Sequence, residues 1–178
     1  LWRAISLALA ENGYDLALHY FSSQKEAEAL ANEVVKFGRR CEIFQADLRD
    51  ATTAFTLLQE ATTCFPGLSV LVNNASRFKA SSIRQTDEVL FQEMLAINLA
   101  APFFLTREFA RHCKNGAIVN ILDTKIFAND SDYAAYYLAK KALAELTKMA
   151  ALEFAPDIRV NAIAPGPTIP TAGSGMSE

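Results

Sequence analysis

The sequence is short of basic residues and of long apolar runs. Its 17 Lys and Arg are outnumbered by 20 Asp and Glu, which gives a formal charge of −3. A chain without a basic surplus has little charge with which to neutralise phosphates, so a nucleic-acid-binding protein is disfavoured. No apolar run reaches the roughly 18 residues of a membrane span, and the amino end lacks the charged-then-apolar pattern of a signal peptide. We therefore expect neither a nucleic acid nor a membrane among its partners.

Cysteine and glycine are scarce as well. The three cysteines are odd in number and far apart, at Cys41, Cys64 and Cys113. They fit neither a disulfide framework nor a zinc cluster, so we expect no metal site and a reducing, cytoplasmic setting. Seven glycines in 178 residues are about 4%, against an average of roughly 7%. The chain also opens without Met, directly in an apolar helical period.

What is present is an alternation of short apolar runs and longer amphipathic stretches. The runs lie at 15–20, 41–47, 68–72, 117–122 and 158–163, and the helical stretches at 1–12, 24–37, 51–64, 86–113 and 131–154. Strands that are apolar on both faces and separated by helices predict an α/β fold with a doubly wound parallel sheet. The length supports one domain over residues 1–178.

Polar residues gather where these strands end, which is where such sheets bind ligands. They are His19-Tyr20, Asp47-Leu48, the segment from Asn73 to Ser76, Asp123 and Pro165-Gly166. The sequence therefore predicts a ligand site along the carboxyl edge of the sheet.

Tyr136 and Lys140 are four residues apart in a predicted helix, so they share one face about a turn apart. An ammonium beside a phenol favours the phenolate and lowers the phenol pKa from about 10. Such a pair supplies a proton donor for a substrate that receives hydride. Tyr137 and Lys141 have the same spacing, and two polar residues on a helix surface are the simpler interpretation of either pair alone.

Five features occur together in order: Asn73-Asn74-Ala75, Asn98, the strand end at Asp123, the Tyr-x-x-x-Lys helix and Pro165-Gly166. In this arrangement residues 1–166 resemble the short-chain dehydrogenase/reductase family, which implies a Rossmann-like fold. The family register selects Tyr136 and Lys140. By the resemblance, Tyr136 is the general acid and Lys140 holds the nicotinamide ribose and tunes the tyrosine. Asn98 would lie in a helix kink that supports a proton-relay water.

The resemblance also implies a cofactor groove. Its residues would be His19, Tyr20, Ser22, Ser23, Asp47, Leu48, Asn74, Ala75, Ser76, Tyr136, Lys140, Pro165 and Gly166. NAD-specific sites of this fold place an acidic residue after the second strand, where it holds the ribose hydroxyls. This chain has serines there and no carboxylate to repel a 2′-phosphate, so NADPH (or NADP) is the expected cofactor.

Asp123 departs from the family, most members of which have Ser at this position. The pteridine reductases of the family carry Asp there, and two further segments resemble theirs: Asn74-Ala75-Ser76-Arg77-Phe78 and His19-Tyr20-Phe21-Ser22-Ser23. The resemblance places Phe78 on the flat pterin, with Asp123 and Tyr136 at its ring nitrogens. The expected substrate is therefore a pterin-like small molecule. A generic carbonyl or 3-oxoacyl reductase, and a non-catalytic scaffold or binding protein, are the alternatives.

Parts of the family pattern are not found in these residues. The first strand, with its Thr-Gly-x-x-x-Gly-x-Gly phosphate loop, is expected before residue 1, and the closing strand after Glu178. The first strand belongs in the middle of the sheet, between the family's second and fourth strands. The helices at 86–113 and 131–154 also carry more apolar positions than one sheet face covers, which predicts a homo-oligomer, a tetramer by the resemblance.

Overall fold

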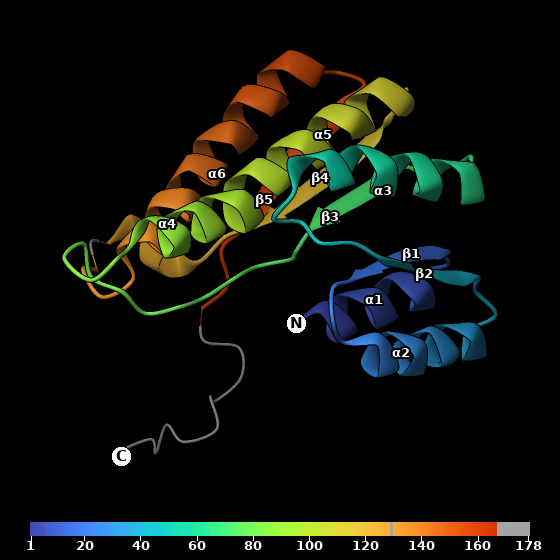
Figure 1. Cartoon of the computed structure of the whole chain (residues 1–178). Coiled ribbons are helices and arrows are strands. Elements are labelled where there is room, and N and C mark those ends of the chain that lie inside the picture. Colours follow the sequence, from blue (N-terminus) through green and yellow to red (C-terminus); the bar gives the residue numbers. More distant parts are fainter. Residues whose placement is uncertain (129, 167–178) are drawn as a thin grey trace.

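Helices and strands alternate along the chain, as predicted (Figure 1). The structure, a computed structural model, describes residues 1–128 and 130–166. The helices are α1 (Trp2–Glu11), α2 (Gln24–Lys36), α3 (Ala51–Cys64), α4 (Glu88–Leu95), α5 (Ala101–His112) and α6 (Ala134–Phe154), with a π-helical segment η1 (Ala96–Ala100) and a 3-10 helix η2 (Thr124–Phe127). The strands are β1 (Leu16–Tyr20), β2 (Cys41–Gln45), β3 (Val70–Asn73), β4 (Gly116–Ile121) and β5 (Ile158–Ile163).

All strand pairs are parallel, which confirms the predicted α/β class, but the strands form two sheets. β1 pairs with β2, from Leu16 opposite Cys41 to Tyr20 opposite Gln45. β3, β4 and β5 form a second sheet in that order. Crossovers through helices are the usual connection between parallel strands, and every connection within these sheets contains one.

The helices cover the sheets in two groups. α1 and α2 pack beside β1 and β2, and α2 buries one face through Ala27, Leu30 and Val34. α5 and α6 pack on the three-stranded sheet, and α3 lies against α5 (Figure 1). Gly13 and Gly38 end α1 and α2 at φ values of 88° and 72°, where a side chain would be strained. Their positions explain two of the few glycines.

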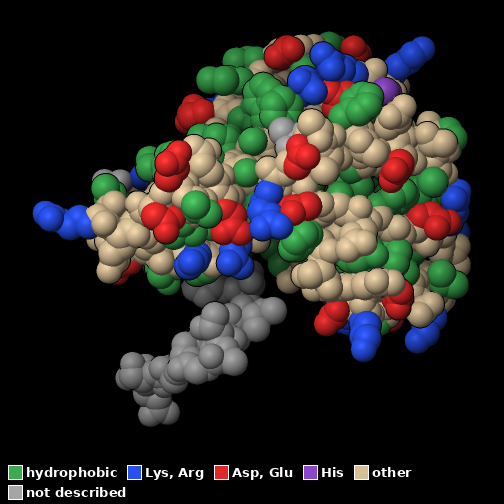
Figure 2. Space-filling view, viewed as in Figure 1, with side chains coloured by type: hydrophobic (Ala, Val, Ile, Leu, Met, Phe, Trp, Pro, Cys, Tyr) green, Lys and Arg blue, Asp and Glu red, His purple; other side chains and the backbone are tan. Residues whose placement is uncertain are grey.

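α4, η1 and α5 form one continuous helix from Glu88 to His112, as the sequence predicts apart from the π-helical interruption. Among the described residues it is the one helix long and apolar enough, by length and composition, to cross a membrane. A core helix passes the same test, and this helix contributes Met94 and Phe109 to buried clusters. In the space-filling view, apolar side chains lie among charged ones over α5 and α6 (Figure 2).

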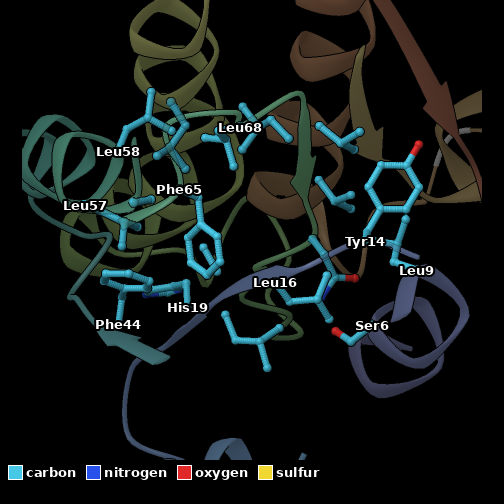
Figure 3. A pocket seen from close by; sticks show the side chains of 18 of the residues that line it. Ser6, Leu9, Tyr14, Leu16, His19, Phe44, Leu57, Leu58, Phe65 and Leu68 are labelled. Carbon is cyan, nitrogen blue, oxygen red and sulfur yellow. The ribbon is translucent and has the colours of Figure 1, made fainter. Parts of the chain in front are cut away.

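A cavity of about 620 Å³ separates the two sheets between β1 and β3. Apolar side chains from α1, β1, β2 and α3 point into it (Figure 3). Those labelled in the view include Leu9, Leu16, Phe44, Leu57, Leu58, Phe65 and Leu68. No strand among residues 1–128 and 130–166 pairs with the edges of β1 and β3 that border it. The gap therefore lies where the resemblance expects the family's first strand.

Candidate functional site

Asp123 and Tyr136 meet at the carboxyl end of β4. Asp123 follows the strand and caps η2, since its Oδ1 accepts a hydrogen bond of 2.8 Å from the Lys125 N–H. Its Oδ2 accepts a hydrogen bond of 3.2 Å from the Tyr136 hydroxyl in the first turn of α6. The fold thus brings together the carboxylate and the phenol to which the sequence assigns the chemistry.

The pKa of Tyr136 is raised, which is opposite to the expected direction. Burial of the phenol is the largest cause, followed by the negative charge of Asp123 and its hydrogen bond. The Ser76 hydroxyl acts in the other direction but is outweighed. The prediction of a lowered pKa is therefore wrong. A phenol that keeps its proton at neutral pH is nevertheless the form that can donate one.

Lys140 explains why the expected lowering does not occur. Its Nζ donates a hydrogen bond of 2.8 Å to the backbone carbonyl of Ile121 and lies 5.9 Å from the centre of the Tyr136 ring. The side chain is buried, and burial lowers the pKa of Lys140 to about 8. The ammonium is thus anchored to the end of β4, with two further N–H donors for a ligand.

Asn98 lies in the π-helical segment η1, in agreement with the expected kink. Its Nδ2 donates to the carbonyls of Arg77, at 2.9 Å, and Met94, at 3.0 Å. Its Oδ1 accepts from the Ser76 hydroxyl, at 2.7 Å, and from the Arg77 N–H, at 3.2 Å. The side chain is fully buried and saturated by these contacts. In this structure Asn98 positions the loop after β3, and its proton-relay role stays a prediction.

Asn73 is the last residue of β3, directly before that loop, and belongs to a chain of buried polar side chains. Its Nδ2 donates to Asn120, at 2.8 Å, and to Thr106, at 3.3 Å, and Asn120 donates in turn to Thr147. Oδ1 of Asn73 is buried and has no hydrogen-bond partner within the described part of the chain. Asn73, together with the predicted cofactor residues Asn74 and Ala75, lines the large cavity. An N–H donor placed in that cavity would supply the missing hydrogen bond to Oδ1 of Asn73.

The predicted phosphate end of the groove lies between β1 and α2. Ser22 and Ser23 are exposed, and the Ser23 side chain makes no capping hydrogen bond although the residue is the N-cap of α2. Its hydroxyl and the free N–H groups of the first turn are suited to an anion. Tyr20 ends β1. The ring of His19, a residue expected in the cofactor groove, contacts the Ala46 carbonyl at 2.9 Å, and burial lowers the pKa of His19.

Arg49 is a further residue of this region, and no sequence pattern points to it. Its guanidinium lies 5.2 Å from the centre of the Phe21 ring, so a residue after β2 reaches the loop after β1. It also binds Asp47 through a bidentate contact with distances down to 2.5 Å, and these hydrogen bonds lower the pKa of Asp47. The Leu48 side chain is buried in the core, and the adenine clamp expected of Asp47 and Leu48 stays a prediction.

Phe78 and Pro165 complete the surroundings of the Asp123–Tyr136 pair. The rings of Phe78 and Tyr136 meet in a T-shaped contact, with ring centres 4.8 Å apart. The Pro165 carbonyl accepts a hydrogen bond of 3.2 Å from the Thr124 N–H, which brings the end of β5 beside Asp123. Gly166 is exposed, and a side chain at this position would meet open space. Within residues 1–128 and 130–166, no group of three or more His, Cys, Asp or Glu side chains is placed to hold a metal ion.

The chain belongs to the short-chain dehydrogenase family. Residues 1–176 match the profile described as short chain dehydrogenase. Two curated relatives that are named as an oxidoreductase and a reductase support this membership. An uncharacterized oxidoreductase of Mycobacterium tuberculosis is 32% identical over 97% of this chain and 66% of its own length. A 3-oxoacyl-(acyl-carrier-protein) reductase of Staphylococcus aureus is 33% identical over 92% and 68%. The chain thus spans about two thirds of the length of these relatives.

Two similar solved structures are NADP complexes, and one of these proteins is named as a dihydrofolate reductase. FolM alternative dihydrofolate reductase 1 from Brucella suis, in complex with NADP, has a TM-score of 0.89 at 34% identity, over 94% of this chain and 71% of that one. A putative dehydrogenase from Burkholderia cenocepacia with bound NADP has a TM-score of 0.88 at 30% identity, over 93% and 64%. The predicted Rossmann-like class is therefore confirmed.

Proposed function

We propose that this protein is an NADPH-dependent reductase of a pteridine, a dihydropterin or dihydrofolate ring. The observation that carries the proposal is the Asp123 carboxylate, hydrogen-bonded at 3.2 Å to the Tyr136 hydroxyl. A pterin offers ring nitrogens and N–H groups, which can pair with both members of this couple. A plain ketone develops negative charge on its oxygen, which a neighbouring carboxylate would repel.

The residues at the two ends of the groove fit a phosphorylated dinucleotide. Ser22, Ser23 and the first turn of α2 offer donors for the 2′-phosphate, and the Arg49 guanidinium lies 5.2 Å from the ring centre of Phe21, the residue before Ser22. Lys140, anchored at the end of β4, would hold the nicotinamide ribose. When bound, the cofactor supplies the hydride. The NADP bound by the two similar solved structures supports this choice of cofactor.

The chain's own residues then have separate roles. Tyr136 donates the proton, because burial and the neighbouring charge keep its phenol protonated. Asp123 orients that hydroxyl and accepts hydrogen bonds from ring N–H groups. Lys140 places positive charge 5.9 Å from the centre of the ring that becomes a phenolate. Asn98 fixes the loop that carries Ser76 and Phe78 over the site.

Reduction of a 3-oxoacyl thioester is the second candidate. It is favoured by the 33% identity to the Staphylococcus aureus reductase. The two candidates differ in what they require at position 123. A carboxylate at position 123 favours protonation of a basic ring nitrogen but repels the negative charge that develops on a carbonyl oxygen. A Ser hydroxyl at this position instead donates a hydrogen bond to the carbonyl.

A side-by-side assay of the full-length gene product tests the proposal. Wild type, Asp123→Ala and Asp123→Ser are each given NADPH with dihydrobiopterin, dihydrofolate or a short 3-oxoacyl thioester. We expect pterin turnover by wild type and a loss of about 10²-fold or more in both variants, with NADPH affinity retained. Thioester turnover by wild type without pterin turnover would retire the pteridine assignment. Improvement of that turnover in Asp123→Ser would establish the alternative.

A further inference from the structure

Phe78 is held by a second aromatic residue, Tyr133, which no sequence motif singles out. Its ring stacks on that of Tyr133, with centres 4.4 Å apart and an angle of 8° between the planes. It also makes a T-shaped contact with Tyr136, with ring centres 4.8 Å apart and an angle of 79° between the planes. Phe78 is nevertheless 54% exposed, so most of its surface is available to a ligand. A side chain this exposed would sample several rotamers without such a contact.

Tyr133 is itself fixed by backbone contacts between two distant segments. It forms a parallel bridge with Ser81, whose N–H donates to the Asp132 carbonyl at 2.7 Å. The Ser81 carbonyl accepts from the Ala134 N–H at 3.1 Å. The loop after β3 is thus fastened to the start of α6. Since α6 also carries Tyr136, the loop residue Phe78 and the phenol are held at a fixed mutual angle.

The contribution of Tyr133 comes from its ring. Across the described ranges, its hydroxyl has no hydrogen-bond partner, whereas its ring contacts Phe78 and, at 6.0 Å between centres, Tyr137. Stacked and edge-to-face pairs are favourable beyond their buried area. A phenylalanine at position 133 would keep these contacts, and an aliphatic residue would lose the stacking.

We propose that Tyr133 is a positioning residue for substrate selection, which acts by holding Phe78 at a right angle to the Tyr136 phenol. The planes of Phe78 and Tyr136 are nearly perpendicular. A flat heteroaromatic ring can therefore stack on Phe78 while the edge of that heteroaromatic ring reaches the Tyr136 hydroxyl. This inference rests on the proposed reduction of a pteridine. It adds a residue that contacts Phe78 and sets how tightly the pterin is bound.

The test compares Tyr133→Phe, Tyr133→Leu and Tyr133→Ala in the full-length gene product, with NADPH and dihydrobiopterin. We expect Tyr133→Phe to match wild type. Tyr133→Leu and Tyr133→Ala should raise the KM for dihydrobiopterin by about 2- to 12-fold, the range of one aromatic pair, with kcat within about twofold. The leucine variant keeps apolar volume in case alanine prevents folding. NADPH affinity should not change.

A double-variant cycle separates this role from a merely structural one. If Tyr133 acts through Phe78, adding Tyr133→Ala to Phe78→Ala leaves the KM of the Phe78→Ala variant unchanged. Effects that multiply, or a joint fall in kcat and NADPH affinity in Tyr133→Leu, would overturn the inference. So would a large effect of Tyr133→Phe. Wild type without any pterin turnover would overturn the proposed function and this inference together, whereas pterin turnover insensitive to Tyr133 would overturn only the inference.

Discussion

The Tyr136 hydroxyl donates a hydrogen bond to Oδ2 of Asp123, and the same carboxylate uses Oδ1 to cap η2 through the Lys125 N–H. One oxygen therefore fixes the carboxylate to the backbone, and the other faces the phenol. A carboxylate held in this way cannot rotate freely between partners. The direction of its hydrogen bond with the phenol is consequently set by the fold before any substrate binds.

Tyr136→Phe is expected to lower turnover by about 10²–10⁴-fold, because it removes the proton donor from the Asp123 pair. NADPH affinity should stay close to that of wild type, since the ring and Lys140 remain. Steady-state kinetics with a saturating cofactor measures the first effect, and fluorescence titration the second. Tyr137→Phe is the matched control, because Tyr137 is buried next to Tyr136 but has no hydrogen bond to Asp123 among the described residues. Inactivation by the control instead would show that the register is wrong.

Arg49→Ala is expected to weaken NADPH binding by about tenfold and to leave NADH binding unchanged. A hydrogen bond to a charged group is worth more than a neutral one, and Arg49 lies over Phe21, next to the serines of the phosphate site. Titration of both dinucleotides against wild type and variant gives the ratio. Arg39→Ala is the control, because among the described residues the Arg39 guanidinium donates to the Gly13 carbonyl and contacts no residue of the phosphate site.

A second substitution tests the preference for NADPH over NADH by adding a negative charge instead of removing a positive one. Tyr20→Asp adds negative charge at the end of β1, beside Ser22 and Ser23, and should erode the preference for NADPH. Equal affinity of the unmodified protein for NADPH and NADH would contradict the charge argument at this site.

The sequence predicts the elements and the polar strand ends well, because both follow from local patterns. Runs such as Val70-Leu71-Val72 are apolar on both faces, and the Tyr-x-x-x-Lys spacing depends only on helix geometry. The contacts of Arg49 with Phe21 and of Tyr133 with Phe78 join segments 28 and 55 residues apart (49 − 21 and 133 − 78), and no local pattern encodes them. They became visible only in three dimensions.

The wrong pKa direction for Tyr136 has a similar origin. Helical spacing places the Lys140 side chain on the same face as the phenol, but it does not say which acceptor the ammonium chooses. The Ile121 carbonyl at the end of β4 takes that hydrogen bond. Burial and the Asp123 carboxylate then decide the pKa of the phenol.

We propose that the exposed apolar side chains of α6 form an interface between copies of this protein. Leu138, Met149 and Leu152 are 56%, 64% and 83% exposed and recur at helical spacing along α6. Light scattering of the full-length gene product should give the mass of an oligomer, and a tetramer is the expected form. Leu152→Glu should lower that mass. Phe37→Glu, at another exposed apolar position, should leave it unchanged. A monomeric wild type would contradict this proposal.

Turnover is expected to fall as the pH rises past about 8, because burial lowers the pKa of Lys140 to about 8. Below that pH the ammonium is charged and stabilises the phenolate left when Tyr136 gives up its proton. Above it the amine is neutral and this stabilisation is lost. A pH profile of kcat at saturating NADPH should therefore show a descending limb near pH 8. Lys148→Ala, which removes an exposed lysine of the same helix, should not move it.

Asp123 also affects the pH at which this descending limb lies. Its negative charge raises the pKa of Lys140 and opposes the larger effect of burial. Asp123→Ala removes that charge, so the pKa of Lys140 should fall further below 8, and the charged form should disappear at a lower pH. Because this variant is expected to lose pterin turnover, carbon-13 NMR of the labelled lysine side chains reads the titration directly, with Lys140→Met used to assign the signal. A Lys140 pKa that rises or stays constant in Asp123→Ala would show that the two charges do not interact across the site.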